Sequence, residues 1–154
     1  MNTHNPPPRQ QLLARGTIGN DVSFLLARAN AVSLSTASAH LAEHGLRVRT
    51  YIVLSLACDD VRPSQKEIAE FLRLDPSQVV TLIDELQDRG LVDRVPDPRD
   101  RRSNVLVATP AGREAHARAR VGVVHAEDHL LAALSADERD TLARLLRGLA
   151  FAAG

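Results

Sequence analysis

The chain has 154 residues, of which 44% are hydrophobic and 25% are charged, and its formal net charge is zero. This composition is typical of one globular domain with a core of its own, and no stretch reaches the 18 or more apolar residues of a membrane span. A lone cysteine, Cys58, excludes an intrachain disulfide and a cysteine-based zinc finger. The chain has no Trp, one Tyr and three Phe, which argues against binding of single-stranded nucleic acid by base stacking.

The N-terminal segment 1–18 is polar at its start and contains the run Pro6-Pro7-Pro8. It lacks the apolar core of a signal peptide, so we expect a disordered arm on a cytoplasmic protein. A long first helix is predicted within 19–45, ended by Gly45, because apolar residues recur at helical spacing. These residues are Val22, Leu25, Leu26, Ala29 and Val32.

A second helix is predicted after Gly45, ending near Asp59-Asp60. Residues at helical spacing give it one common face. They are Val48, Tyr51, Ile52 and Ser55.

Two short helices with strong start signals follow. Ser64 and Glu67 have the spacing of a capping box, and Asp75 followed by Pro76 is an N-cap with proline at the tolerated first position. Gly90 predicts a left-handed C-terminal cap, with Leu91 packing back on the second helix. The buried stripe of this second helix is predicted to be Val79, Leu82, Ile83 and Leu86. Two short helices joined by a tight turn form a helix-turn-helix.

The period of the pattern changes after Gly90. Val92 and Val95 alternate with charged residues, and the apolar β-branched run 105–107 lies beyond a polar loop over 96–104. This pattern predicts a β-hairpin, or wing.

The remaining chain is again predicted to be helical. Thr109-Pro110 begins a long helix, and Ser135 with Glu138 forms another capping box. The last helix has a leucine stripe larger than one helix pair needs for its own core, which predicts a dimer interface; a monomer with a helical appendage is the alternative. The stripe comprises Leu142, Leu145, Leu146 and Leu149.

The expected fold class is therefore mostly α with a small β-wing. A winged helix-turn-helix lobe spans 46–109, with its motif between Ser64 and Thr109, and dimerisation helices at 19–45 and 110–154 flank it.

Four motifs in order resemble the MarR family. They are Ser64-Gln65-Lys66-Glu67-Ile68-Ala69, Leu82-Ile83-Asp84-Glu85-Leu86-Gln87-Asp88-Arg89-Gly90-Leu91-Val92, Asp97-Pro98-Arg99-Asp100-Arg101-Arg102 and Leu106-Val107-Ala108-Thr109-Pro110-Ala111-Gly112. The resemblance covers about residues 20 to 150. It implies a homodimer with interlocking terminal helices that represses nearby genes, relieved by a small phenolic or carboxylate ligand or by oxidation.

The predicted recognition helix spans Pro76 to Arg89. Its early outward residues Ser77, Gln78 and Thr81 are small and polar enough to meet base edges in the major groove of duplex DNA. A solvated amphipathic face is the alternative. We also expect backbone contacts from Ser64, Gln65 and Lys66 at the start of the preceding helix, and a two-fold dimer would read a pseudo-palindromic operator.

The wing tip carries Arg99, Asp100, Arg101 and Arg102, which suits a narrow minor groove. Asp97 and Asp100 oppose phosphate binding unless they orient the arginines by pairing. In similar proteins one wing arginine enters the groove, and another pairs with a carboxylate of the recognition helix. The resemblance makes Arg102 and Asp84 the candidates for such a contact. A charged solvent loop is the alternative.

A ligand site is predicted from the resemblance alone. Arg28 occupies the position of a carboxylate-binding arginine in some members that respond to aromatic acids, with Phe24 and Tyr51 placed to pack a ring. A surface or interface arginine is the simpler interpretation.

Other interpretations remain open. Cys58 suggests redox sensing, although Asp59-Asp60 disfavours a thiolate, and the pairs His40/His44 and His125/His129 have a spacing compatible with zinc chelation. A winged helix can also bind proteins, but the exposed arginines of the wing argue for DNA. The sequence contains no phosphate-binding glycine loop, nucleophile elbow or acid–base constellation, so we expect neither an enzyme nor a cofactor.

Overall fold

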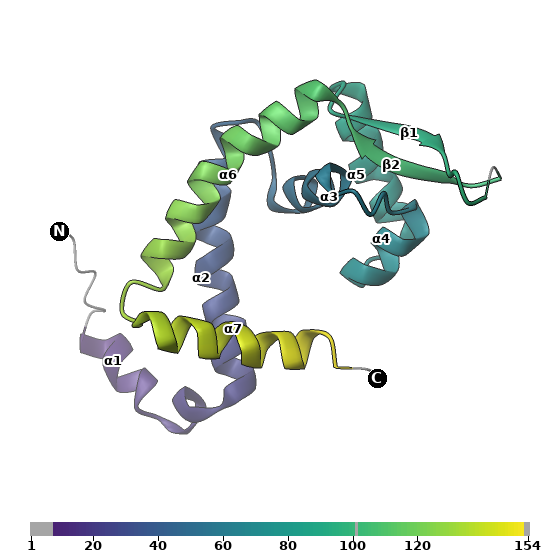
Figure 1. The fold of residues 1–154 in the computed structure, drawn as a ribbon. Coiled ribbons are helices and arrows are strands. Elements are labelled where there is room, and N and C mark those ends of the chain that lie inside the picture. The colour runs from purple at the N-terminus through teal and green to yellow at the C-terminus, as the bar shows by residue number, and fades with distance from the viewer. Residues whose placement is uncertain (1–7, 101, 153–154) are drawn as a thin grey trace.

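The computed structural model describes residues 8–100 and 102–152. Within them the chain is mostly helical, with one two-stranded antiparallel sheet, in agreement with the expected winged-helix fold (Figure 1). The elements are α1 (Pro8–Ala14), the short 3-10 helix η1 (Thr17–Asn20), α2 (Val22–Ala42), α3 (Val48–Cys58), α4 (Gln65–Leu72), α5 (Pro76–Asp88), β1 (Val92–Pro96), β2 (Asn104–Ala108), α6 (Pro110–Leu130) and α7 (Ala136–Ala150).

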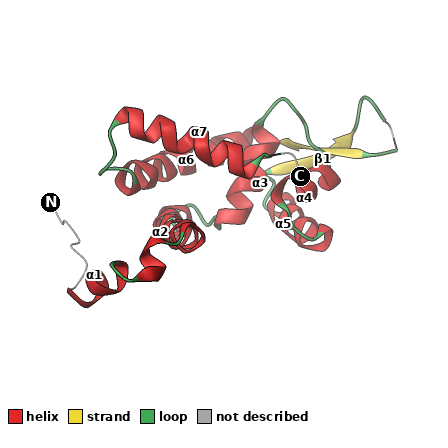
Figure 2. Cartoon of the chain, turned by 90° about the horizontal axis from the view of Figure 1, so that it is seen from below, coloured by secondary structure: helices red, strands yellow, loops and turns green. Residues whose placement is uncertain are grey.

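Two long helices form a stalk that leads to a lobe of shorter elements. The stalk consists of α2 and α6, which run side by side, and the lobe consists of α3, α4, α5 and the hairpin (Figure 1). Gly122 permits this close approach, since a Cβ atom there would lie 2.8 Å from Cβ of His40. Seen from below, α7 lies on the α6 side of the stalk (Figure 2).

The hydrophobic core lies mainly in the lobe. All four predicted stripe residues of α5 are buried, so this prediction is confirmed. They pack with residues from the other lobe elements, among them Val53, Leu54, Ile68, Val92 and Leu106. Burial of such side chains contributes roughly 1.5–3 kcal/mol each, so the position of α5 is strongly determined.

The predicted helix starts are confirmed by their hydrogen bonds. The Ser64 backbone N–H donates to Oε2 of Glu67 (2.7 Å), and the N–H of Ser77 donates to Oδ1 of Asp75 (2.8 Å). Gly90 has φ +67° and Leu91 is 8% exposed, as expected for a left-handed cap with a hydrophobic contact.

The wing is anchored at its base. β1 and β2 pair antiparallel from Val92 opposite Ala108 to Pro96 opposite Asn104. The N–H of Leu106 also donates to the carbonyl of Pro63 (2.8 Å), which joins β2 to the segment that enters α4. The hairpin is therefore fixed to the helix-turn-helix and not only to α6.

The expected disorder of segment 1–18 is wrong for its described part, which forms α1 and η1. The physical reason is local: residues 10–14 are Gln-Gln-Leu-Leu-Ala, all good helix formers, and Pro8 occupies the first helical position, where its missing N–H costs nothing. The first seven residues lie outside the described part of the chain.

The outer faces of the stalk and of α7 are apolar and exposed. Leu41 is the one fully buried residue of α2, and α7 has none. The exposed side chains include Val22, Leu25, Leu26, Val32, Leu145, Leu146 and Leu149. Across residues 8–100 and 102–152, no helix is long and apolar enough to cross a membrane.

Candidate nucleic-acid interface

The polar residues at the start of α5 differ in what their side chains already bind. The hydroxyl of Ser77 donates to Asp75, whose pKa is lowered by these hydrogen bonds from Ser77, and the hydroxyl of Thr81 donates to the carbonyl of Ser77 (3.1 Å). Gln78 is exposed, and its side chain has no partner among the described residues. The amide of Gln78 is therefore the most available group for a base edge.

An arginine of the wing strand holds α5, but it is not the predicted one. Arg94 of β1 pairs through Nη2 with Oδ1 of Asp84 (2.5 Å) and donates to the side-chain oxygen of Gln87. The predicted contact between Arg102 and Asp84 is wrong. The register places Arg94 opposite Leu106, beside α5, whereas Arg102 lies beyond the last strand pair.

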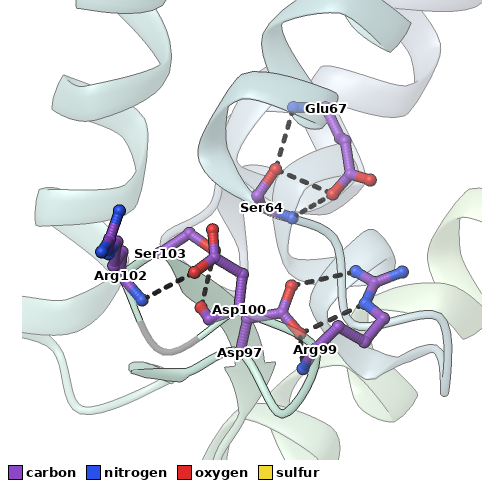
Figure 3. Close-up of polar contacts among 7 residues, drawn as sticks. All are labelled: Ser64, Glu67, Asp97, Arg99, Asp100, Arg102 and Ser103. Carbon is purple, nitrogen blue, oxygen red and sulfur yellow. Dashed lines mark hydrogen bonds and ion pairs between the residues drawn. The ribbon is translucent and has the colours of Figure 1, made fainter.

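At the wing tip, one aspartate orients an arginine as expected. Asp97 is only 6% exposed and accepts from both Nε (3.2 Å) and Nη2 (3.1 Å) of Arg99, as well as from its backbone N–H (2.8 Å) (Figure 3). These hydrogen bonds lower the pKa of Asp97. A carboxylate with two guanidinium bonds fixes the direction of that guanidinium.

Asp100 acts on the backbone of the tip instead. Its Oδ1 accepts from the backbone N–H of Arg102 (3.0 Å), and its carbonyl accepts from the hydroxyl of Ser103 (3.0 Å). The Arg102 side chain is exposed and points away from Arg99 (Figure 3). Arg101 lies outside the described residues.

The residues predicted to contact the DNA backbone line part of a hollow between α4 and the wing. Ser64, Gln65 and Lys66 line it together with Arg94 and Arg99. The hollow is electrostatically mixed, because it also contains the three carboxylates Glu67, Glu70 and Asp97. The hydrogen bonds from Ser64 lower the pKa of Glu67, and Lys66 lies 3.8 Å from Glu70.

The hollow beside Arg28 is not shared with the other two predicted ligand residues. Arg28 lines a shallow hollow on α2 with Ala31, Val32, Ser35 and Thr36, and neither Phe24 nor Tyr51 lines it. Tyr51 is buried and stacks on His116 of α6, with ring centroids 5.3 Å apart. The Nε2 atom of His116 is buried without a hydrogen-bond partner, and burial lowers the pKa of this imidazole.

The geometry around Cys58 and the histidine pairs gives no support to redox or zinc sensing. Burial raises the pKa of the Cys58 thiol, against an opposing effect of Arg113, so the thiolate that redox chemistry needs is disfavoured. Among the described residues, no three His, Cys, Asp or Glu side chains are grouped to hold a metal ion.

Three residues that fix α5 were missed by the sequence analysis: Glu85, Arg89 and Arg94. Arg94 carried a short-range signal, because Asp84 and Gln87 are three residues apart on one helix face and Arg94 follows just after the turn at Gly90. The partners of Glu85 and Arg89 lie about 40 residues away, near Gly45, and no local pattern indicates them.

Comparison with known proteins gives a consistent result. Residues 44–103 match the family model described as MarR family. The chain is 29% identical over 153 residues to a putative transcriptional regulatory protein for the hcr operon of Thauera aromatica, covering 97% of this chain and 92% of that protein.

Solved structures extend the match over most of the chain. A MarR family transcriptional regulator from Rhodococcus sp. RHA1 has 34% identity and a TM-score of 0.83, over 90% of this chain and 99% of that one. CouR from Rhodococcus jostii RHA1, bound to p-coumaroyl-CoA, has 34% identity and a TM-score of 0.80, over 88% and 95%. CouR has also been solved on a 23-mer DNA duplex (33% identity, TM-score 0.77, over 88% and 96%). The chain belongs to the MarR family of transcriptional regulators.

Proposed function

We propose that this chain is a non-enzymatic, homodimeric repressor that binds a pseudo-palindromic operator in duplex DNA and releases it when a small ligand binds. The observation that carries the proposal is the rigid pairing of a capped helix with an arginine-tipped wing. Arg94 joins the two elements through Asp84, and Asp97 fixes the direction of the Arg99 guanidinium at the hollow between the wing and α4. A helix and a wing held at a constant separation can enter successive grooves of one duplex.

Within this proposal the residues have distinct roles. Pro76, Ser77, Gln78 and Thr81 lie at the major groove, and Asp84 positions α5 through Arg94. Arg99, Asp100, Arg101 and Arg102 form the wing that approaches the minor groove, and Ser64, Gln65 and Lys66 face the phosphate backbone. CouR, a relative of the same fold, has been solved bound to a 23-mer DNA duplex, which supports DNA binding by this chain.

The dimer is supported by the apolar faces that the single chain leaves exposed. Leu145, Leu146 and Leu149 are 53%, 39% and 66% exposed, an unusual state for neighbouring leucines of a soluble protein. We assign α2, α6 and α7, within 19–45 and 110–154, to dimerisation and 46–109 to DNA binding. A protein that binds the bacterial chromosome in this way acts in the cytoplasm.

The ligand is proposed to be an aromatic carboxylate or its thioester. CouR binds p-coumaroyl-CoA, and Arg28 offers an exposed guanidinium on α2 that can pair with an anionic group. A ligand that prefers one separation of the two recognition helices lowers DNA affinity by its differential binding free energy, and bound DNA must weaken the ligand equally.

A footprint of the purified protein on the region upstream of its own gene tests the proposal. We expect protection of two half-sites about one helical turn apart, roughly 10 base pairs from centre to centre. Equal binding to that fragment and to a scrambled duplex of the same composition, with or without p-coumaroyl-CoA, would reject DNA regulation. A winged helix that binds another protein would then be the remaining interpretation.

A further inference from the structure

The C-terminal end of α5 contacts the turn that joins α2 to α3. Arg89 donates from Nη1 to the carbonyl of Gly45 (2.8 Å) and from Nη2 to the carbonyl of His44 (3.4 Å). Glu85, one helical turn before Arg89, pairs with the guanidinium of Arg47. We call Glu85 and Arg89, with these three partners, the α5 clasp.

In the clasp, Arg89 binds backbone carbonyls in the turn that follows α2. This helix ends at Ala42, and Gly45 turns the chain with φ +64°. The two carbonyls that Arg89 binds lie in the turn just after the C-terminus of α2, the end of a helix near which a positive charge is favourable. A planar guanidinium with several donors can bind two neighbouring carbonyls at once, so Arg89 suits this place better than any other side chain.

The clasp and the wing hold different flanks of α5. Asp84 and Gln87 face Arg94 of the wing, whereas Glu85 and Arg89 face the α2–α3 turn. The recognition helix is thus tied on one side to the element that enters the neighbouring groove. On the other side it is tied to the helix that belongs to the stalk.

Surface exposure indicates that the clasp serves geometry more than stability. The side chain of Arg47 is 70% exposed, and ion pairs at such sites stabilise a fold by little. The lobe core already determines which face of α5 is buried. What the clasp adds is a polar link of defined length between α5 and the end of α2.

We propose that Glu85 and Arg89 are positioning residues that set the separation of the two recognition helices in the dimer, by transmitting the position of α2 to α5. The inference rests on the proposed function, because it presupposes two half-sites read together. A dimer with a stiff link discriminates strongly between operators of different half-site spacing, and a dimer with a loose link discriminates weakly.

The experiment measures that discrimination directly. A duplex of about 30 base pairs is selected from a randomised pool by the wild-type protein. A second duplex carries one extra base pair between the half-sites, which increases their separation by about 3.4 Å. We expect the insertion to weaken wild-type binding about tenfold, the size of one mispositioned base pair. For Arg89→Ala we expect a loss of less than about threefold.

Three variants control for charge and folding. Asp88→Ala changes a neighbouring exposed residue outside the clasp and should keep the wild-type spacing ratio. Arg89→Lys retains a donor and should fall between wild type and Arg89→Ala. The exchanged pair R47E with E85R should restore the ratio that either single substitution reduces, and circular-dichroism melting identifies any variant that fails to fold.

The outcomes separate the clasp from the proposed function. A wild-type spacing ratio in folded Arg89→Ala, or no recovery in the exchanged pair, would overturn the clasp while DNA regulation stands. Failure of the wild-type protein to enrich any duplex would overturn the proposed function itself.

Discussion

Arg99 and Arg102 occupy the same wing tip but are held differently. Asp97 already binds the guanidinium of Arg99, whereas the Arg102 side chain is exposed and only its backbone N–H is bound, by Asp100. We expect Arg102→Ala to weaken operator binding by about 1–3 kcal/mol, the scale of one groove contact. A gel-shift titration at constant salt measures it, and unchanged affinity would remove Arg102 from the interface.

Gln78 is the residue of α5 for which we expect the clearest effect on sequence preference. Its neighbours Ser77 and Thr81 donate their hydroxyl hydrogens within the helix, which leaves the Gln78 amide for a base edge. Gln78→Ala should cost about 1–3 kcal/mol and relax preference at one base pair without changing the salt dependence. Lys66→Ala is the contrasting variant, expected to reduce the slope of log affinity against log salt by about one. Equal behaviour of the two variants would contradict this division of roles.

The order of the wing tip is predicted to depend on the ionisation of Asp97. Because Arg99 lowers the pKa of Asp97 in the folded protein, this group stabilises the fold above its unfolded pKa of about 3.9, and the stabilisation is lost as pH falls through the lower folded value. Asp97→Asn should therefore lower the melting temperature at pH 7, with the difference from wild type shrinking below about pH 4. Asp93→Asn, at an exposed position of β1, is the control. A difference that stays constant from pH 7 to pH 3 would contradict the assignment.

At the scale of elements, the junction between the wing and α6 depends on one close contact. A Cβ atom on Gly112, in the first turn of α6, would lie 1.9 Å from the backbone oxygen of Leu91. Gly112→Ala should therefore destabilise the fold by about 1–3 kcal/mol or more, although alanine is the better helix former. Urea unfolding measures the change. Ala117→Ser, exposed on the same helix, should cost less than about 0.7 kcal/mol, and a stabilised Gly112→Ala would show that α6 can move away from Leu91.

At the scale of the whole molecule, we propose that the apolar face of α7 decides the oligomeric state. Introducing a charge there, as in Leu145→Glu, should convert a species of twice the 16.7 kDa chain mass into one of single mass, because an interface core excludes an unpaired charge. Sedimentation at micromolar concentration distinguishes the two. Val61→Glu, at a 78% exposed valine of the lobe, should leave the assembly intact. A single-mass wild-type protein would contradict the proposed dimer.

The order and the ends of the lobe elements could be predicted from the sequence alone. Capping signals at Ser64 and Asp75 in the lobe, and at Ser135 before α7, are local, since the side chain bonds a backbone group two or three residues away. The buried stripe of α5 follows from helical periodicity within one segment. Such features need no knowledge of the remaining chain.

Only the tertiary structure decided which residues hold the recognition helix. Arg94 and not Arg102 reaches Asp84 because the strand register sets which wing residue lies beside α5. Arg89 reaches Gly45 because the lobe folds back on the end of α2. A polar side chain can pair with any complementary group that packing brings within about 3 Å, so its partner depends on the arrangement of distant segments, whereas the caps and stripes depend on neighbours along the chain.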